Sequence, residues 1–100
     1  NMTRTEAHIA LETIHNLRIA QRATAEKFQI ACECLGASSI AKRKREWVRA
    51  NERLNAAVTA WNDFASCDVA LARRAINDNP IHSTTAERLN LRGYYAADWE

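Results

Sequence analysis

Apolar residues recur every seven positions in the middle of this 100-residue chain, at Ile40, Trp47, Leu54 and Trp61. A sustained seven-residue apolar repeat is typical of a helix that packs along a coiled-coil-like seam. The preceding segment carries a series with the same spacing, and the two series pair at a constant sum of residue numbers, as an antiparallel hairpin requires. The pattern therefore predicts two long antiparallel helices. The expected pairs are Leu35 with Ile40, Phe28 with Trp47, Gln21 with Leu54, Ile14 with Trp61, and Ala7 with Asp68.

Capping signals set the boundaries of the first two helices. Thr3 and Glu6 have the spacing of a capping box, in which each side chain satisfies a backbone amide of the other residue. Gly36 is expected to end the first helix in a left-handed conformation, and Ser38 or Ser39 to cap the second. The predicted elements, within a single helical domain spanning 1–100, are helices at 3–35, 39–76 and 84–92, followed by an aromatic C-terminal tail.

Proline and a second capping box delimit the last two elements. Pro80 disfavours helix in the residue before it, so the second helix is expected to stop just upstream. Thr84 and Glu87 form a further capping box, which predicts the short third helix. Gly93 is expected to end it.

The long helices carry apolar residues on a second side as well. On the first helix this side contains Ile9, Ile19, Ala23 and Ile30. A helix pair buries one stripe of each helix, and the short third helix is too small to cover both. A twofold dimer of hairpins would cover the second stripe; the alternative is a tail folded over part of it. The predicted fold class is all-α, a long antiparallel hairpin with a short C-terminal helix, dimerising into a four-helix bundle.

Trp47 and Trp61 are expected in the core, because both belong to the seven-residue repeat. Each indole would bury about 200 Å². The alternative is that one of them lies at a partner interface as a binding hot spot.

The apolar and aromatic residues near the C-terminus can be interpreted in two ways. They are Leu89, Leu91, Tyr94, Tyr95 and Trp99. A tail docked on its own hairpin and an arm that reaches another chain fit the sequence about equally, since aromatic residues are enriched in binding surfaces. The candidate partner-binding residues of the second stripe and of this cluster are Ile9, Ile19, Ala23, Ile30, Leu89, Leu91, Tyr94, Tyr95 and Trp99.

A basic cluster opens the second helix. The segment 42–53 holds six basic residues against Glu46 and Glu52, whereas the whole chain has a net charge of only +2. A solvated helix end is the favoured interpretation, because the total charge is not that of a dedicated nucleic-acid binder. The alternative is a basic helical dimer that contacts nucleic-acid phosphates. The residues of that alternative patch are Lys42, Arg43, Lys44, Arg45 and Arg49.

Isolated polar residues on the helices suggest little chemistry. His8, Glu12 and His15 share a helix face and resemble half of a metal site, but the H-E-x-x-H order is absent. We expect solvent-facing side chains and no metal. Asp68 falls in line with the apolar repeat, where it either pairs with Arg73 or marks the end of the seam.

Cysteine usage and missing motifs narrow the function classes. Three cysteines form no disulfide framework, so we expect buried thiols in a reducing, cytoplasmic setting. We see neither a signal-peptide core nor a membrane-length apolar run. With no phosphate-binding loop and no nucleophile motif, we expect neither enzymatic activity nor a cofactor. The cysteines are Cys32, Cys34 and Cys67.

The surplus apolar surface favours a protein-binding role. We expect a small helical adaptor or inhibitor that buries its stripe or tail on another protein and occludes a surface which that protein uses, for example, to dimerise. The size of the chain, its helices at 3–35 and 39–76 and its apolar end at 89–99 resemble the small helical antiactivators of bacterial quorum sensing, such as the QslA type. The resemblance implies a partner of the LuxR type, a transcriptional activator kept from dimerising and binding DNA. It is architectural and assigns no individual binding residue.

Overall fold

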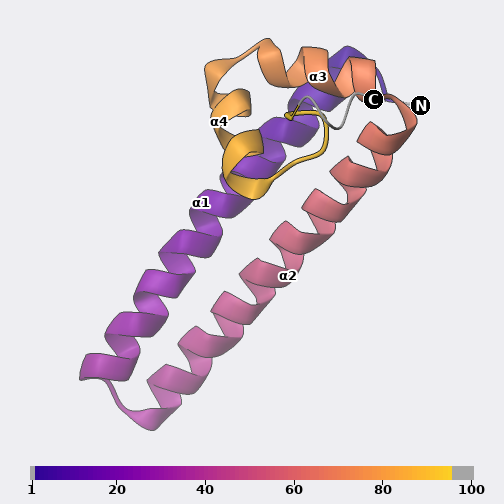
Figure 1. Cartoon of the computed structure of the whole chain (residues 1–100). Helices are drawn as coiled ribbons and strands as arrows, with labels where there is room; N and C mark the ends of the chain where they lie inside the picture. Colours follow the sequence, from indigo (N-terminus) through magenta and orange to yellow (C-terminus); the bar gives the residue numbers. More distant parts are fainter. Residues whose placement is uncertain (1, 96–100) are drawn as a thin grey trace.

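The computed structural model describes residues 2–95, and the chain is helical over most of this range (Figure 1). Two long helices lie side by side as a hairpin, which confirms the predicted all-α class; dimerisation stays a prediction. The described part measures 50 × 23 × 23 Å, and its radius of gyration of 16.0 Å exceeds the roughly 13 Å of a compact 100-residue chain. The molecule is therefore elongated. Its helices are α1 (Arg4–Cys34), α2 (Ala37–Cys67), α3 (Val69–Asn77) and α4 (Pro80–Leu89).

The hairpin has the predicted register. The rings of Phe28 and Trp47 pack with their centroids 5.5 Å apart, as one of the five expected pairs requires. The capping box at the start of α1 is also present: Glu6 N donates to Thr3 Oγ1 at 3.2 Å, and Thr3 N donates to Glu6 Oε1 at 3.1 Å. Local capping and the apolar repeat thus account for the two long helices.

The hairpin turn differs from the prediction. Gly36 has φ −78° and ψ 169°, so it is extended rather than left-handed, and it precedes α2 instead of ending α1. Its carbonyl accepts the first backbone hydrogen bond of α2, from Ile40 N at 3.0 Å. Helix α2 consequently begins at Ala37, with no side-chain cap, and the serine-cap prediction was wrong.

The segment 39–76, predicted as one helix, is divided between two helices, α2 and α3. It breaks at Asp68, which has φ −144° and ψ 75°, although no glycine or proline is near. Leu71 N donates to Asp68 Oδ1 at 3.1 Å, so the carboxylate caps α3 and offsets the backbone hydrogen bonds lost at the break. The break lets α3 turn back onto α1 and bury Ala72, Ala75 and Ile76. Asp68 therefore marks the end of the seam.

Helix α4 begins four residues earlier than predicted. Asn79 is its cap, with Oδ1 accepting from Ile81 N at 2.9 Å, and Pro80 is the first helical residue. Thr84 lies inside the helix and donates its hydroxyl to the Pro80 carbonyl at 2.9 Å, so it caps nothing. Asn90, at φ 51°, ends the helix in a left-handed conformation, three residues before the predicted end at Gly93.

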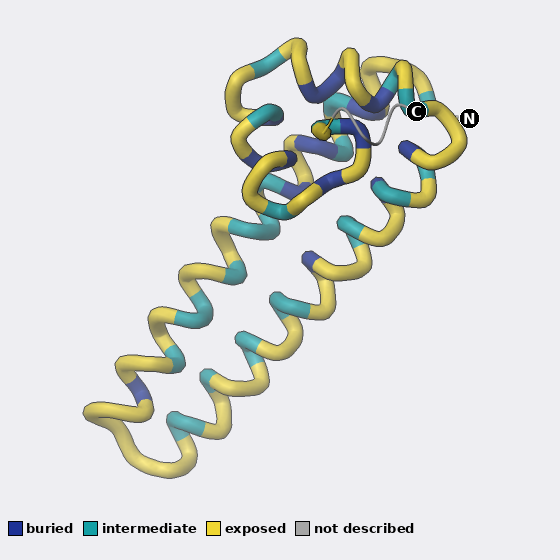
Figure 2. The backbone as a smooth tube through the Cα atoms, in the orientation of Figure 1, coloured by how far each residue is buried: buried dark blue, intermediate teal, exposed yellow. Residues whose placement is uncertain are grey.

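Burial divides the molecule into two regions, which we call the head (residues 2–17 and 54–95) and the stem (residues 18–53). In the head, α3 and α4 cover the first half of α1, and the buried residues gather there (Figure 2). Trp61 is at its centre and only 1% exposed, as expected. The contiguous core consists of Ala7, Leu11, Ile14, Leu54, Trp61, Ala65, Ala72, Ala75, Ile76, Ala86 and Leu91.

The stem has no third layer among the described residues. Only Ala31 is buried there, and the seam residues Phe28 and Trp47 are half-buried. The Trp47 Nε1 atom is shielded from solvent without a hydrogen-bond partner in the described part. The stem is thus held by one two-helix seam with a polar defect in it.

Candidate functional site

The apolar side of α1 that faces away from the seam is uncovered. Ile9, Ile19 and Ile30 are 58%, 54% and 56% exposed, and Ala23 between them is exposed as well. Ile19 and Ile30 are eleven residues apart, close to three full turns, so they lie on the same side of the helix about 16 Å apart along its axis. We call these four residues the isoleucine stripe.

The C-terminal cluster packs on its own head. Leu91 is fully buried. Trp61 Nε1 donates to the Arg92 carbonyl at 3.1 Å, and Arg92 N donates to Asn62 Oδ1 at 2.9 Å. These contacts fix the segment after α4 against α2, which removes Leu91 from the candidate partner surface.

The remaining members of that cluster differ in exposure. Leu89 and Tyr94 are half-buried against the core, and burial raises the pKa of the Tyr94 phenol, with Glu87 adding to the effect. Tyr95 is exposed; its ring packs edge-on against Tyr94, and its hydroxyl donates to Asn90 Oδ1 at 3.3 Å. Trp99 lies outside the described residues.

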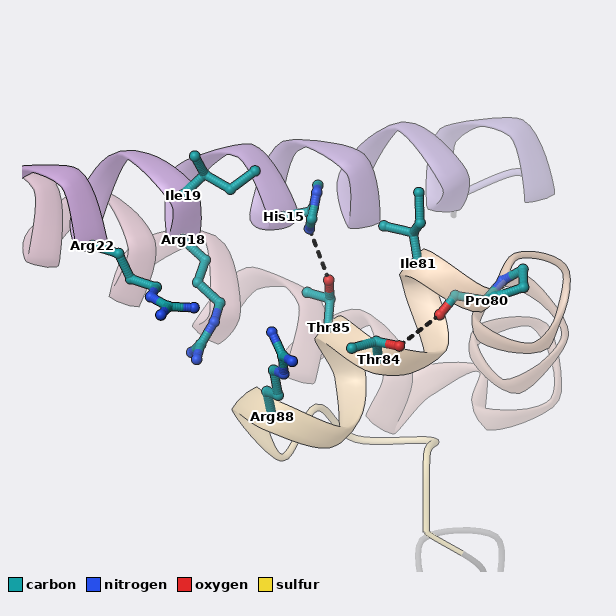
Figure 3. A pocket seen from close by; sticks show the side chains of 9 residues that line it. All are labelled: His15, Arg18, Ile19, Arg22, Pro80, Ile81, Thr84, Thr85 and Arg88. Atoms are coloured by element: carbon teal, nitrogen blue, oxygen red, sulfur yellow. Dashed lines mark hydrogen bonds between the residues drawn. The ribbon is translucent and has the colours of Figure 1, made fainter.

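A groove lies between α1 and α4 at the junction of head and stem. Its volume is about 260 Å³, and it opens beside Ile19, so it is continuous with the isoleucine stripe. Figure 3 shows Arg18 and Arg22 extending from α1 toward the side of α4, and Arg88 extending from α4 toward α1. We call it the arginine groove. Its lining residues are His15, Arg18, Ile19, Arg22, Pro80, Ile81, Thr84, Thr85 and Arg88.

One hydrogen bond between residues far apart in the sequence joins the two walls of the arginine groove. His15 Nδ1 lies 3.2 Å from Thr85 Oγ1, which ties α1 to α4 directly (Figure 3). Thr85 is 3% exposed, whereas Ile81 is 53% exposed and points from α4 toward α1. The walls are therefore fixed while the apolar lining stays accessible.

The charged side chains that line the arginine groove are all basic. Three of its nine lining residues are arginines, and none is acidic. Within residues 2–95 none of these arginines forms an ion pair, whereas Arg4 pairs with Asp78 and Arg43 with Glu46. Guanidinium groups recognise carboxylates and phosphates through paired N–H donors. The groove can therefore bind an anion that carries an apolar part.

The histidines of the predicted half metal site go to separate partners. Arg4 Nε donates to Asp78 Oδ2 at 2.7 Å, its Nη2 pairs with Oδ1, and His8 Nε2 lies 2.7 Å from Oδ2. The Arg4 hydrogen bonds, and then that of His8, lower the pKa of Asp78 to about 2. His15 instead contacts Thr85. The described residues contain no group of three potential metal ligands.

The cations of the basic cluster do not all lie on one side of α2. Arg43 pairs with Glu46 at 3.1 Å, and Lys44 lies with Val48 at a shallow hollow that Arg45 and Arg49 also line. The other cations line a second groove of about 440 Å³ between α2 and α1. Its basic residues, Lys42, Arg45, Arg49 and Arg53, form what we call the basic row.

The expectation of buried cysteines was wrong. Cys32, Cys34 and Cys67 are free and exposed. Two of them lie in the last turn of α1, and the third ends α2. Cys32 and Cys34 lie in the stem, which has no third layer among the described residues.

The sequence predicted the exposed isoleucines but not the arginine groove. Arg18 and Arg22 stand four residues apart, a spacing that places them on one helix face and could have flagged a basic wall. Arg88 joins them only because α3 reverses the chain and brings α4 against α1. That reversal follows from the helix break at Asp68. The sequence offered Asp68 as one candidate for the end of the seam, but it predicted an unbroken helix through this position.

Comparison with known proteins identifies no relative of this chain. No family model, no curated protein and no solved structure matches this chain. Among the helices described, none has both the length and the apolar content that crossing a bilayer demands.

Proposed function

We propose that this chain is a protein–protein interaction module that docks a helical segment of a partner on the isoleucine stripe. The exposure of Ile19 and Ile30 on one side of α1 carries the proposal. Two exposed isoleucines three turns apart, with Ala23 between them, form an apolar strip that a partner helix can cover. The arginine groove at one end adds polar contacts that would orient that helix.

More specifically, we propose that the module is an inhibitor, which occludes a dimerisation or binding surface of a transcriptional regulator. A long helix with one apolar side uncovered can take the place of a helix that a regulator uses in its own dimer. The resemblance to quorum-sensing antiactivators supports this form, and a LuxR-type activator is the partner it implies. A cytoplasmic setting belongs to the same proposal.

Substitution of the isoleucine stripe tests the module. Ile19→Asp/Ile30→Asp places two charges in the stripe, and the fold should survive because both side chains are more than half exposed. Val48→Asp is the control, since Val48 is also exposed but lies on α2. In affinity capture followed by quantitative mass spectrometry, a specific partner should be lost with the double variant and kept with the control. Equal retention by all three proteins would refute the proposal.

A homodimer is the simplest occupant of the stripe in the absence of another partner. Two hairpins pairing through their α1 helices would form the four-helix bundle predicted from the sequence. Light scattering after size exclusion should give twice the chain mass for the wild type and for Val48→Asp, and the monomer mass for the double aspartate variant. A monomeric wild type at about 100 μM would remove the dimer from the proposal.

The basic row favours one second candidate function, nucleic-acid binding. Four cations at steps of three or four residues follow one side of α2 over about 16 Å, and the single acidic residue in their groove, Glu46, is paired with Arg43. Four phosphate contacts predict a slope of about −3.6 for log K against log salt. Neutralising the row should abolish binding of a 20-base-pair DNA probe in fluorescence anisotropy. Absence of wild-type binding at 50 mM salt would exclude this function.

A further inference from the structure

The arginine groove concentrates positive charge that the rest of the chain leaves unbalanced. Arg18 and Arg22 form one wall and Arg88 the other, and no carboxylate within residues 2–95 pairs with any of them. Arg4 and Arg43 pair with Asp78 and Glu46, whereas the arginines of the basic row, like those of the arginine groove, have no ion pair in the described part of the chain. Three like charges in one groove repel one another, and a bound anion would replace this repulsion by attraction.

The spacing of the arginines suits carboxylates on a helix. Arg18 and Arg22 are four residues apart, a rise of about 6 Å along α1. Two carboxylates four residues apart on a second helix have the same spacing and can meet both guanidinium groups. Arg88 on the opposite wall could take a third carboxylate. Paired N–H donors give such contacts direction as well as strength.

The apolar part of the groove indicates a partner with an apolar side. Ile81 and Pro80 line it on α4, and Ile19 links it to Ala23 and Ile30 farther along α1. A small anion would use the guanidinium groups and leave this strip uncovered. An amphipathic helix covers both, with apolar residues on the isoleucines and carboxylates over the arginines.

The charges beside the strip separate a protein helix from a nucleic acid. Glu12 and Glu26 each stand seven residues from Ile19, so both lie on the Ile19 side of α1, two turns away. Both are exposed. A polyphosphate backbone running along α1 would meet these carboxylates, whereas a helix can place neutral or basic side chains opposite them.

We propose that the arginine groove is the docking site for an acidic amphipathic helix of a partner protein. Carboxylates of that helix pair with Arg18, Arg22 and Arg88, and its apolar side covers Ile19 and Ile81. The inference rests on the proposed function, because it names the chemistry of the partner segment that the interaction module would bind.

The test uses a defined peptide. A fluorescein-labelled 18-residue peptide, held helical by a side-chain lactam, carries leucines on one side and glutamates four residues apart on the neighbouring side. A second peptide has glutamine in place of every glutamate. Fluorescence anisotropy gives the Kd of each peptide for the full chain at 50 mM salt. The acidic peptide should bind at least about tenfold more tightly than the glutamine peptide.

Two charge-matched triple variants locate the site. Arg18→Gln/Arg22→Gln/Arg88→Gln removes the groove cations, and Lys42→Gln/Arg45→Gln/Arg49→Gln removes as many charges from the basic row. The first should weaken binding of the acidic peptide about tenfold or more, and the second by no more than about twofold. An Arg→Lys triple at the groove should fall between, because lysine keeps the charge but loses paired donation. Circular dichroism confirms that each variant folds.

Several outcomes would overturn the inference. One is equal weakening by both glutamine triples, which would mean general attraction to a basic protein. Another is tighter binding of a fluorescent 20-base DNA strand that depends on Arg18, Arg22 and Arg88. A third is self-association of the wild type that the groove triple abolishes, since a second copy would then be the occupant.

The result also separates this inference from the proposed function. If no peptide binds, but a captured partner still depends on Ile19 and Ile30, the acidic chemistry is wrong and the interaction module stands. If neither the isoleucine nor the arginine substitutions change any interaction, both proposals fail.

Discussion

The head and the stem are built from the same two helices and the same seven-residue repeat, yet they differ in what the repeat achieves. In the head, α3 and α4 add a further layer, and Trp61 is 1% exposed. In the stem, Trp47 occupies an equivalent repeat position but stays half-buried against Phe28. The repeat thus decides which residues face the seam, whereas the covering elements decide how far they are buried.

This difference also assigns roles to the two regions. The head has a contiguous core that can hold the fold, while the stem presents uncovered apolar and basic surfaces. Binding sites in proteins are commonly positioned by a rigid scaffold that supplies stability elsewhere. The arginine groove fits this division, because it lies where the two regions meet.

Replacing one tryptophan in each region should sharpen the comparison most. Trp61→Ala opens a large cavity in the head and removes the hydrogen bond to the Arg92 carbonyl, so we expect a loss of about 3–5 kcal/mol in the free energy of unfolding. Trp47→Ala should cost only about 1–2 kcal/mol, because the indole is half-buried. Urea denaturation followed by circular dichroism measures both. Equal losses would show that the stem is as well packed as the head.

The two glycines provide a second pair. Gly93 has φ 101°, and a methyl group added there would lie 3.3 Å from the Ala72 side chain, so Gly93→Ala should destabilise the head by about 1–3 kcal/mol. Gly36 is extended and has open space around it, so Gly36→Ala should be neutral or stabilising by up to about 1 kcal/mol. Thermal unfolding of the two variants gives the ranking. A reversed ranking would contradict the packing of Gly93 against α3.

Acid should weaken a contact that only the head possesses. Hydrogen bonds from Arg4 and then from His8 hold the pKa of Asp78 at about 2 instead of 3.8. Since the folded-state pKa is the lower one, the stabilisation is complete above about pH 4 and is lost as the pH falls through 2. The difference in Tm between wild type and Asp78→Asn should therefore shrink from pH 5 to pH 2.

Asp63→Asn provides the control for this titration. Asp63 is an exposed carboxylate of α2 for which no ion pair is found in the described part of the chain. Its substitution should shift the Tm little at any pH. A gap between wild type and Asp78→Asn that stays constant down to pH 2 would mean that the Arg4–Asp78 contact does not stabilise the fold.

The smallest expected effect concerns the polar defect in the stem. Trp47→Phe keeps an aromatic ring against Phe28 and removes the shielded Nε1 donor that has no partner among the described residues. Loss of an unsatisfied buried donor offsets the loss of ring area, so we expect a change within about 1 kcal/mol, of either sign. Urea denaturation detects it. A loss above about 2 kcal/mol would show that the indole nitrogen is hydrogen-bonded in solution.

The two long helices could be predicted from the sequence better than the elements that cover them in the head. The hairpin register, including the Phe28–Trp47 pair, could be predicted because it depends on a repeat and on local capping at Thr3. The break at Asp68 could not, because helix propensity continues through it. The Asp68 cap and the burial of α3 compensate for the break. The arginine groove depends on that break, so it was hidden for the same reason.

Hydrogen exchange of the intact chain, with and without the acidic helical peptide, tests the central claim most directly. Amides of the head should exchange only through global unfolding, and those of the stem much faster through local opening. The peptide should slow exchange in segments 15–30 and 80–88 and leave 42–53 unchanged. Uniform exchange along the free chain, or protection of the basic row instead of the arginine groove, would contradict the account.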